Sequence, residues 1–108
     1  MPGIHFIDFK TNKEKQPNGK IANVNYWMSD KFLIKQIEDT TNVEITFTTM
    51  VSKPLMEQFM SAFIMKCMSI TDPTKIKFNK EGNYKYIVSI NEAKPSDIFS
   101  CVQKHLKL

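Results

Sequence analysis

Several stretches of the chain alternate between apolar and polar residues, which is the pattern of a half-buried β-strand. The clearest is Val43–Val51, where β-branched and aromatic side chains at odd positions alternate with polar ones. Ala22–Met28 alternates in the same way. Its even positions are expected to be buried, and the opposite face would carry Asn23, Asn25 and Trp27. Ile4–Lys10 has apolar residues on both faces, which favours an interior strand followed by a polar loop over residues 11–20.

A hairpin is expected from Lys75–Asn79 and Asn83–Ile90. If the last residue of the first strand pairs with the first residue of the second, the loop is residues 80–82. Gly82 then takes the left-handed position of a three-residue turn. The same register places the apolar side chains on one face, with Phe78 opposite Tyr84 and Ile76 opposite Tyr86.

Three helices are expected between these strands. The first spans residues 29–40 with Ser29 as its N-cap. The second spans residues 52–70 and has Pro54 in its first turn, where a missing N–H does no harm. The third begins at residue 95 or 96. The apolar sides of the first and third helices would consist of Phe32, Leu33 and Ile37, and of Ile98, Phe99, Val102 and Leu106.

The predicted element order is therefore β-β-α-β-α-β-β-α. Strand–helix–strand units need right-handed crossovers, so the strands that flank the first two helices should run parallel. Polar residues at alternate strand positions indicate that all three helices cover the same face. We expect an α+β two-layer sandwich with a mixed five-stranded sheet and three helices on one face. It would form one domain over residues 1–108.

Composition narrows the class of protein. The chain has 108 residues and is 42% hydrophobic, without an apolar run long enough for a membrane span. The N-terminus does not resemble a secretory signal. Cys67 and Cys101 are too few for a disulfide framework, which favours a reducing, cytoplasmic location. With histidine only at His5 and His105, a four-ligand zinc site is hard to assemble, and no metal or other cofactor is expected.

One charged pattern carries a hypothesis of catalysis. Asp72 precedes Glu92-Ala93-Lys94, which follows an apolar strand. This spacing resembles the Asp…Glu-x-Lys core of the restriction-type nucleases. The resemblance implies two carboxylates that bind Mg²⁺ and a lysine that polarises the attacking water. The chain departs from that pattern because Pro95 follows directly and Asp72 is expected in a loop.

Other combinations of reactive side chains favour structural roles. Cys101 and His105 are four residues apart and would be neighbours on the last helix. A cysteine in the body of a helix gains no help from the helix dipole in becoming a thiolate. No glycine-rich phosphate loop is present. We therefore predict no catalytic residue and no enzymatic activity.

The second helix indicates a binding surface. On a helical wheel, most of its apolar residues share one side, while Met65 and Met68 fall on the polar side near Glu57 and Ser61. Methionine is flexible and suits surfaces that adapt to a partner. The favoured hypothesis is a binding module, a regulator or inhibitor, that docks onto another protein. A second copy of the chain would serve equally well as the partner.

The alternative hypothesis is a weakly sequence-specific contact with RNA or single-stranded DNA. The net charge is +4, and all 15 basic residues are lysine. Lysine cannot form the bidentate hydrogen bonds that arginine makes, so the contacts would be mainly ionic contacts to phosphates. The face of the sheet that the helices leave uncovered would carry several lysines and one aromatic side chain, which is similar to the sheets of RNA-recognition domains. The residues proposed for this contact are Lys75, Lys77, Lys85, Trp27, Lys13 and Lys15.

Overall fold

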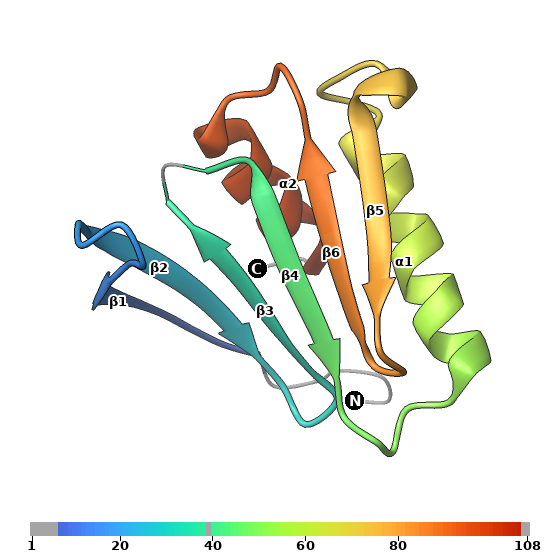
Figure 1. The fold of residues 1–108 in the computed structure, drawn as a ribbon. Helices are drawn as coiled ribbons and strands as arrows, with labels where there is room; N and C mark the ends of the chain where they lie inside the picture. Colours follow the sequence, from blue (N-terminus) through green and yellow to red (C-terminus); the bar gives the residue numbers. More distant parts are fainter. Residues whose placement is uncertain (1–6, 39, 107–108) are drawn as a thin grey trace.

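The protein is described here from a computed structural model, which covers residues 7–38 and 40–106. Its class is α+β, with six strands and two α-helices in the described part of the chain (Figure 1). Neither of these helices is long and apolar enough to cross a membrane. The elements are β1 (Asp8–Lys15), β2 (Ile21–Met28), β3 (Phe32–Ile37), β4 (Asn42–Phe47), α1 (Lys53–Cys67), β5 (Ile76–Glu81), β6 (Lys85–Ile90) and α2 (Pro95–Leu106), with a 3-10 turn at Pro73–Lys75.

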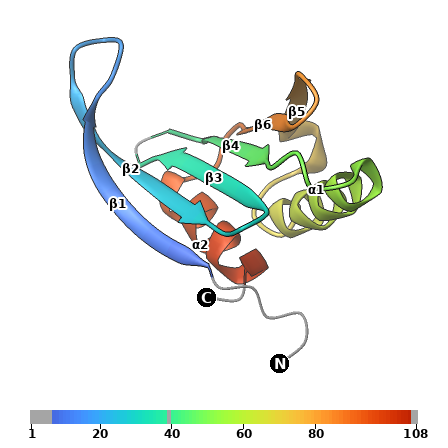
Figure 2. The same cartoon turned by 90° about the horizontal axis from the view of Figure 1, so that it is seen from below.

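The strands form one sheet in the order β1-β2-β3-β4-β6-β5, and every neighbouring pair is antiparallel. The predicted mixed five-stranded sheet is therefore wrong, although the α+β class is confirmed. β4 and β5 do run parallel to each other, as expected for strands that flank a helix, but β6 lies between them. Both helices lie on one face of the sheet (Figure 2).

The predicted helix over residues 29–40 is wrong, since this segment forms β3. Phe32, Ile34 and Gln36 are buried and point to the same face, which is a period of two rather than 3.6. The Oγ atom of Ser29 does accept hydrogen bonds from the backbone N–H groups of Lys31 and Phe32, at 3.0 and 3.3 Å. These bonds close the β2–β3 turn instead of capping a helix.

The first strand also differs from the prediction. β1 continues to Lys15 and pairs with β2 from Asp8–Met28 to Lys15–Ile21. The predicted polar loop is reduced to residues 16–20, where Gly19 adopts a positive φ of 85°. The early part of the predicted strand, residues 4–6, lies outside the described residues. Figure 2 shows this long β1–β2 hairpin bending away from the helix layer.

The two faces of β2 are reversed relative to the prediction. Trp27 is fully buried on the helix side of the sheet, where its indole N–H donates to Oε1 of Gln103 on α2 at 3.0 Å. Its ring also contacts Phe99 of α2, with centroids 5.4 Å apart. Val24, on the other face, is fully buried as well. Alternation could not identify the core side because β2 has apolar residues on both faces.

The β5–β6 hairpin forms with a register four residues away from the predicted one. Phe78 pairs with Val88 and Glu81 with Lys85, so the loop is residues 82–84. Gly82 has a positive φ of 71°, as predicted. Since side chains alternate with a period of two, a shift of four leaves every side chain on its expected face. Phe78 therefore still points to the helix layer.

The two predicted helices that exist begin where the sequence indicates. The N–H of Leu55 donates to Oγ of Ser52 at 3.4 Å, so Ser52 caps α1, and α2 begins at Pro95. α1 ends at Cys67 rather than residue 70, and the strand predicted over Val43–Val51 ends at Phe47. Rings of α1 contact β3 and β4, whereas α2 lies against β2. Each helix also adjoins an edge strand, since Phe9 of β1 contacts Phe99 of α2 and α1 lies at the β5 side of the sheet (Figure 1).

The position of β3 generates a stability prediction. Replacing the fully buried Ile34 with alanine should lower the free energy of unfolding by about 2–5 kcal/mol. Leu33→Ala is the matched control, because its side chain is 36% exposed on the open face and should cost less than about 1 kcal/mol. Urea unfolding measures both. A larger cost at Leu33 than at Ile34 would contradict the strand.

Candidate functional site

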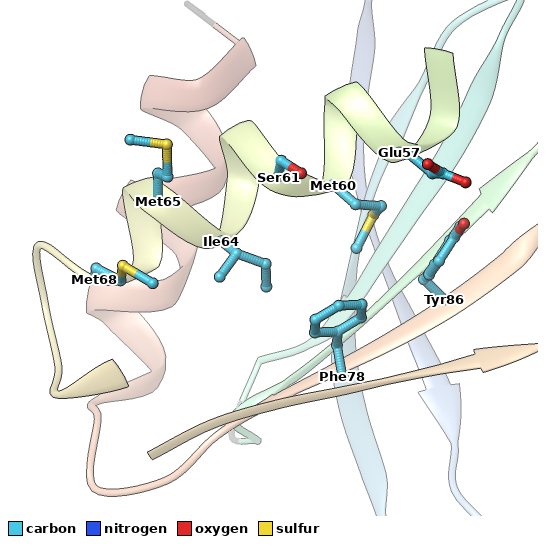
Figure 3. A pocket seen from close by; sticks show the side chains of 8 residues that line it. All are labelled: Glu57, Met60, Ser61, Ile64, Met65, Met68, Phe78 and Tyr86. Atoms are coloured by element: carbon cyan, nitrogen blue, oxygen red, sulfur yellow. The ribbon is translucent and has the colours of Figure 1, made fainter. Parts of the chain in front are cut away.

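A groove of about 380 Å³ runs between α1 and the β5–β6 hairpin. Figure 3 shows Met60 and Ile64 reaching from α1 toward Phe78 on β5. The lining residues are Glu57, Met60, Ser61, Ile64, Met65, Met68, Phe78 and Tyr86. All four residues predicted for partner binding, Glu57, Ser61, Met65 and Met68, are therefore part of one concave surface.

The groove is rich in exposed apolar atoms. Met65 is 70% exposed, Met68 46% and Phe78 51%. Among the described residues that line the groove, Glu57 alone carries a charge. Large apolar side chains that share a concavity on a protein surface are typical of interaction sites, whereas isolated exposed ones are common.

Sequence reasoning missed Phe78 as a surface residue. The hydrophobic pattern of the hairpin assigns it correctly to the helix face, and on that face its strand partner Val88 is fully buried. Phe78 remains half exposed because β5 is the outermost of the described strands. The edge position of β5 depends on the strand order, which the hydrophobic pattern does not specify.

The open face of the sheet carries lysines that are paired with carboxylates. Nζ of Lys85 lies 3.2 Å from Glu44 and 3.8 Å from Glu81, and Lys35 lies 3.9 Å from Glu44. The hydrogen bond and charge of Glu44 raise the pKa of Lys85. These pairs are solvent-exposed and contribute little to stability. They do lower the positive charge that this face would present to a phosphate backbone.

The six residues predicted for nucleic-acid binding do not form one surface. Trp27 is buried beneath the sheet and cannot stack on a base, which corrects that assignment. Lys13 is on β1 and Lys77 is on β5, at opposite edges of the sheet. At a strand spacing of about 4.8 Å these edges are roughly 24 Å apart. The other members are Lys15 on β1, Lys85 on β6, and Lys75, whose Nζ lies 3.2 Å from Glu92.

The residues that resemble a nuclease core are engaged in local contacts. Asp72 accepts hydrogen bonds from the N–H and the hydroxyl of Thr74, both at 3.0 Å, and these bonds lower its pKa. Glu92 adopts a positive φ of 60° and pairs with Lys75. No group of three or more potential metal-binding side chains occurs in the described ranges. Asp72 caps a 3-10 turn and does not lie on a strand, unlike the residue it resembles.

The cysteines and His105 belong to the interface between the two helices. Cys67 and Cys101 are free and buried, and the contact with Cys101 together with burial raises the pKa of the Cys67 thiol. A neutral, buried thiol is a poor nucleophile. The ring of His105 packs edge-on against Phe59, with centroids 4.7 Å apart, and also contacts Phe63. This environment is that of a packed core rather than of a thiol–imidazole pair.

A second cavity, of about 600 Å³, lies beside the start of α2. Its floor holds two buried amides: Asn25 Nδ2 donates to Gln36 Oε1 at 3.4 Å, and Gln36 Nε2 donates to the carbonyl of Pro95 at 3.1 Å. The hydroxyl of Thr11 completes this network with a 2.8 Å bond to Oδ1 of Asn25. The network connects β1, β2 and β3 to α2. The sequence pattern does not predict this network, because it places Gln36 in a helix over residues 29–40.

Comparison with known proteins adds no relative. No protein-family model, curated protein or solved structure matches this chain significantly. Function must therefore be argued from the chemistry of the surfaces themselves. Of these surfaces, the α1–β5 groove combines exposed apolar side chains with a concave shape.

The burial of His105 generates a pH prediction. Burial and the charge of Lys66 lower the pKa of His105 below its ordinary 6.5, and no described residue hydrogen-bonds to its Nε2. As the pH falls through about 6.5, the unfolded chain takes up this proton before the folded one does, so the free energy of unfolding should fall. Urea unfolding at pH 7.5, 6.5 and 5.5 measures this loss.

His105→Phe is the control, because it keeps an aromatic ring at this position and removes the titration. The variant should lose less stability than the wild type between pH 6.5 and 5.5. Equal losses in the two proteins would show that His105 does not cause the acid sensitivity.

Proposed function

We propose that this protein is a non-enzymatic binding module that acts by protein–protein interaction, as a regulator or inhibitor, through the α1–β5 groove. The observation that carries the proposal is the concentration of exposed Met65, Met68 and Phe78 around one concavity. Leaving these side chains in water is unfavourable, and a protein partner that covers them gains roughly 25 cal/mol for each Å² of apolar surface buried.

The character of the groove also favours a protein as the ligand. Unbranched methionine side chains adapt to different shapes and make favourable contacts with aromatic rings. Glu57 and Ser61 on the same wall add polar groups that can orient a partner's backbone or side chains. An apolar centre with a few polar groups at its border is the usual arrangement of a protein interface.

The other candidate activities have less support. A nucleic-acid interface that used all the proposed lysines would span opposite edges of the sheet, and its proposed aromatic residue is buried. A nuclease would have to release Asp72 and Glu92 from their contacts with Thr74 and Lys75. The candidate residues for either chemistry are thus dispersed or already engaged, whereas those of the groove lie together and face solvent.

Replacing both Met65 and Met68 with glutamate should weaken retention of the partner and leave folding intact, because both side chains are exposed. Immobilised protein, incubated with a nuclease-treated extract of the native cell, provides the assay. We expect the double variant to bind the retained protein at least about tenfold more weakly, or about 1.4 kcal/mol less favourably.

Ile21→Glu is the matched control. Ile21 is 71% exposed, like Met65, but it lies on β2, far from β5 in the strand order. This variant should retain the partner as the wild type does. Equal retention by the double variant would refute the groove as the docking surface.

A salt series tests the nucleic-acid alternative directly. Because phosphate contacts made by lysine weaken steeply as salt rises, a nucleic-acid binder would hold single-stranded RNA or DNA at low ionic strength. We expect the protein to retain neither single-stranded RNA nor single-stranded DNA at low salt. Retention that falls sharply as salt is added would favour the alternative over protein docking.

A further inference from the structure

We propose that the protein chain that docks at the groove is a second copy of this chain, joined edge to edge through β5. The inference rests on the proposed function, since it assigns the occupant of the same surface. The two copies would form one continuous antiparallel sheet, with a two-fold axis passing beside Phe78. A self-complementary patch of this kind is the commonest route to a dimer.

The backbone of β5 is prepared for such pairing. The N–H of Asn91 donates to the carbonyl of Lys75 at 2.9 Å, so this pair is a hydrogen-bonded one. Bonded and non-bonded pairs alternate along an antiparallel ladder. The backbone groups of Lys77, Asn79 and Glu81 therefore face β6, and those of Ile76, Phe78 and Lys80 point away from it. β5 is the last of the described strands, so the outward groups of Phe78 and Lys80 and the carbonyl of Ile76 lie at a free edge, while the N–H of Ile76 donates to the carbonyl of Pro73.

The side chains at this edge adjoin the groove. Phe78 is central among the three outward residues, is 51% exposed, and lines the groove together with Met65 and Met68. Joining two β5 strands antiparallel about Phe78 places the two Phe78 rings side by side on the helix face. Each ring would then extend the apolar wall of the other copy's groove, and methionine beside an aromatic ring is a favourable contact.

The charges of β5 also match in this register. With Phe78 opposite Phe78 of the second copy, Lys77 lies opposite Asn79, Ile76 opposite Lys80, and Lys75 opposite Glu81. No pair brings like charges together, and the Lys75–Glu81 contact occurs twice by symmetry. Within one copy Glu81 already pairs with Lys85 and Lys75 with Glu92. The dimer would thus continue a row of alternating charges across the junction.

Other registers are less favourable. An axis at Lys77 or at Lys80 places that lysine opposite its own copy, and an axis at Ile76 places Lys75 opposite Lys77. Like charges directly opposite each other destabilise a strand pair. An axis at Asn79 avoids this but leaves Phe78 facing Lys80. The register centred on Phe78 is the one that joins the aromatic side chains and separates the lysines.

Sedimentation equilibrium of the full chain over a wide concentration range is the first test. The wild type should reach twice its monomer mass of 12.6 kDa, and Phe78→Glu should remain at the monomer mass. Ile21→Glu, an equally disruptive change at an exposed apolar site on β2, should behave as the wild type. Because Phe78 is half exposed, circular dichroism should show that Phe78→Glu folds normally.

Cysteine cross-linking tests the register. Under mild oxidation Phe78→Cys should form an intermolecular disulfide, because paired strand residues lie within the Cα separation that a disulfide requires. Asn79→Cys should not, since residue 79 would face residue 77. The wild type, whose two cysteines are buried, gives the background. Cross-linking of Asn79→Cys but not of Phe78→Cys would overturn the proposed register.

The outcomes separate this inference from the proposed function. A wild type that stays monomeric at every concentration, or a dimer that survives Phe78→Glu, overturns the second copy as the occupant. If the extract partner is still lost on changing Met65 and Met68, the groove remains a docking surface for another protein. Both proposals fail if the wild type is monomeric and if every protein that it retains from the extract is retained equally by the Met65 and Met68 double variant.

Discussion

The crossover from β4 through α1 to β5 determines which part of the sheet remains uncovered. It passes over β6, so β5 becomes the outermost strand and α1 lies at that side of the sheet, with Phe59 of α1 reaching β3 and β4 (Figure 1). Phe78 consequently points to the helix layer yet remains half exposed. The groove, its exposed methionines and the free backbone edge all follow from this one connection.

The buried and half-buried polar side chains elsewhere in the molecule mainly stabilise the fold. The buried amides Asn25 and Gln36 connect the sheet to the start of α2, and Trp27 bonds to Gln103 in the last turn of α2. On the other face, Tyr26 donates to Glu14 at 2.6 Å, and burial followed by this bond raises the pKa of Tyr26 to about 12. These polar groups bond to each other, whereas the apolar side chains of Met65, Met68 and Phe78 at the groove are exposed to solvent.

The features that the sequence predicted correctly are those determined by residues close to each other in the chain. Ser52 as a helix cap, Gly82 at a left-handed position and the face of Phe78 are confirmed, because each depends on residues close in the chain. Met65 and Met68 were predicted to be exposed from the helical period, and they are.

The predictions that were wrong concern features determined by residues far apart in the chain. Ser29 forms the same hydrogen bonds at the start of a helix and in the β2–β3 turn, so it could not exclude a helix over residues 29–40. Trp27 and Val24 compete for the core from opposite faces of β2, and the choice is made by Phe99 and Gln103 on α2. The edge position of β5 needs the strand order, which no local pattern contains.

Residue-resolved amide hydrogen exchange of β5 tests the central claim most directly, because it reads the free edge one backbone N–H at a time. At low protein concentration the amides of Phe78 and Lys80 should exchange quickly, while those of Lys77, Asn79 and Glu81 are protected by β6. Raising the concentration should protect the first two and leave the others unchanged. Fast exchange of the amides of residues 78 and 80 at every concentration would contradict the pairing of β5 with a second copy.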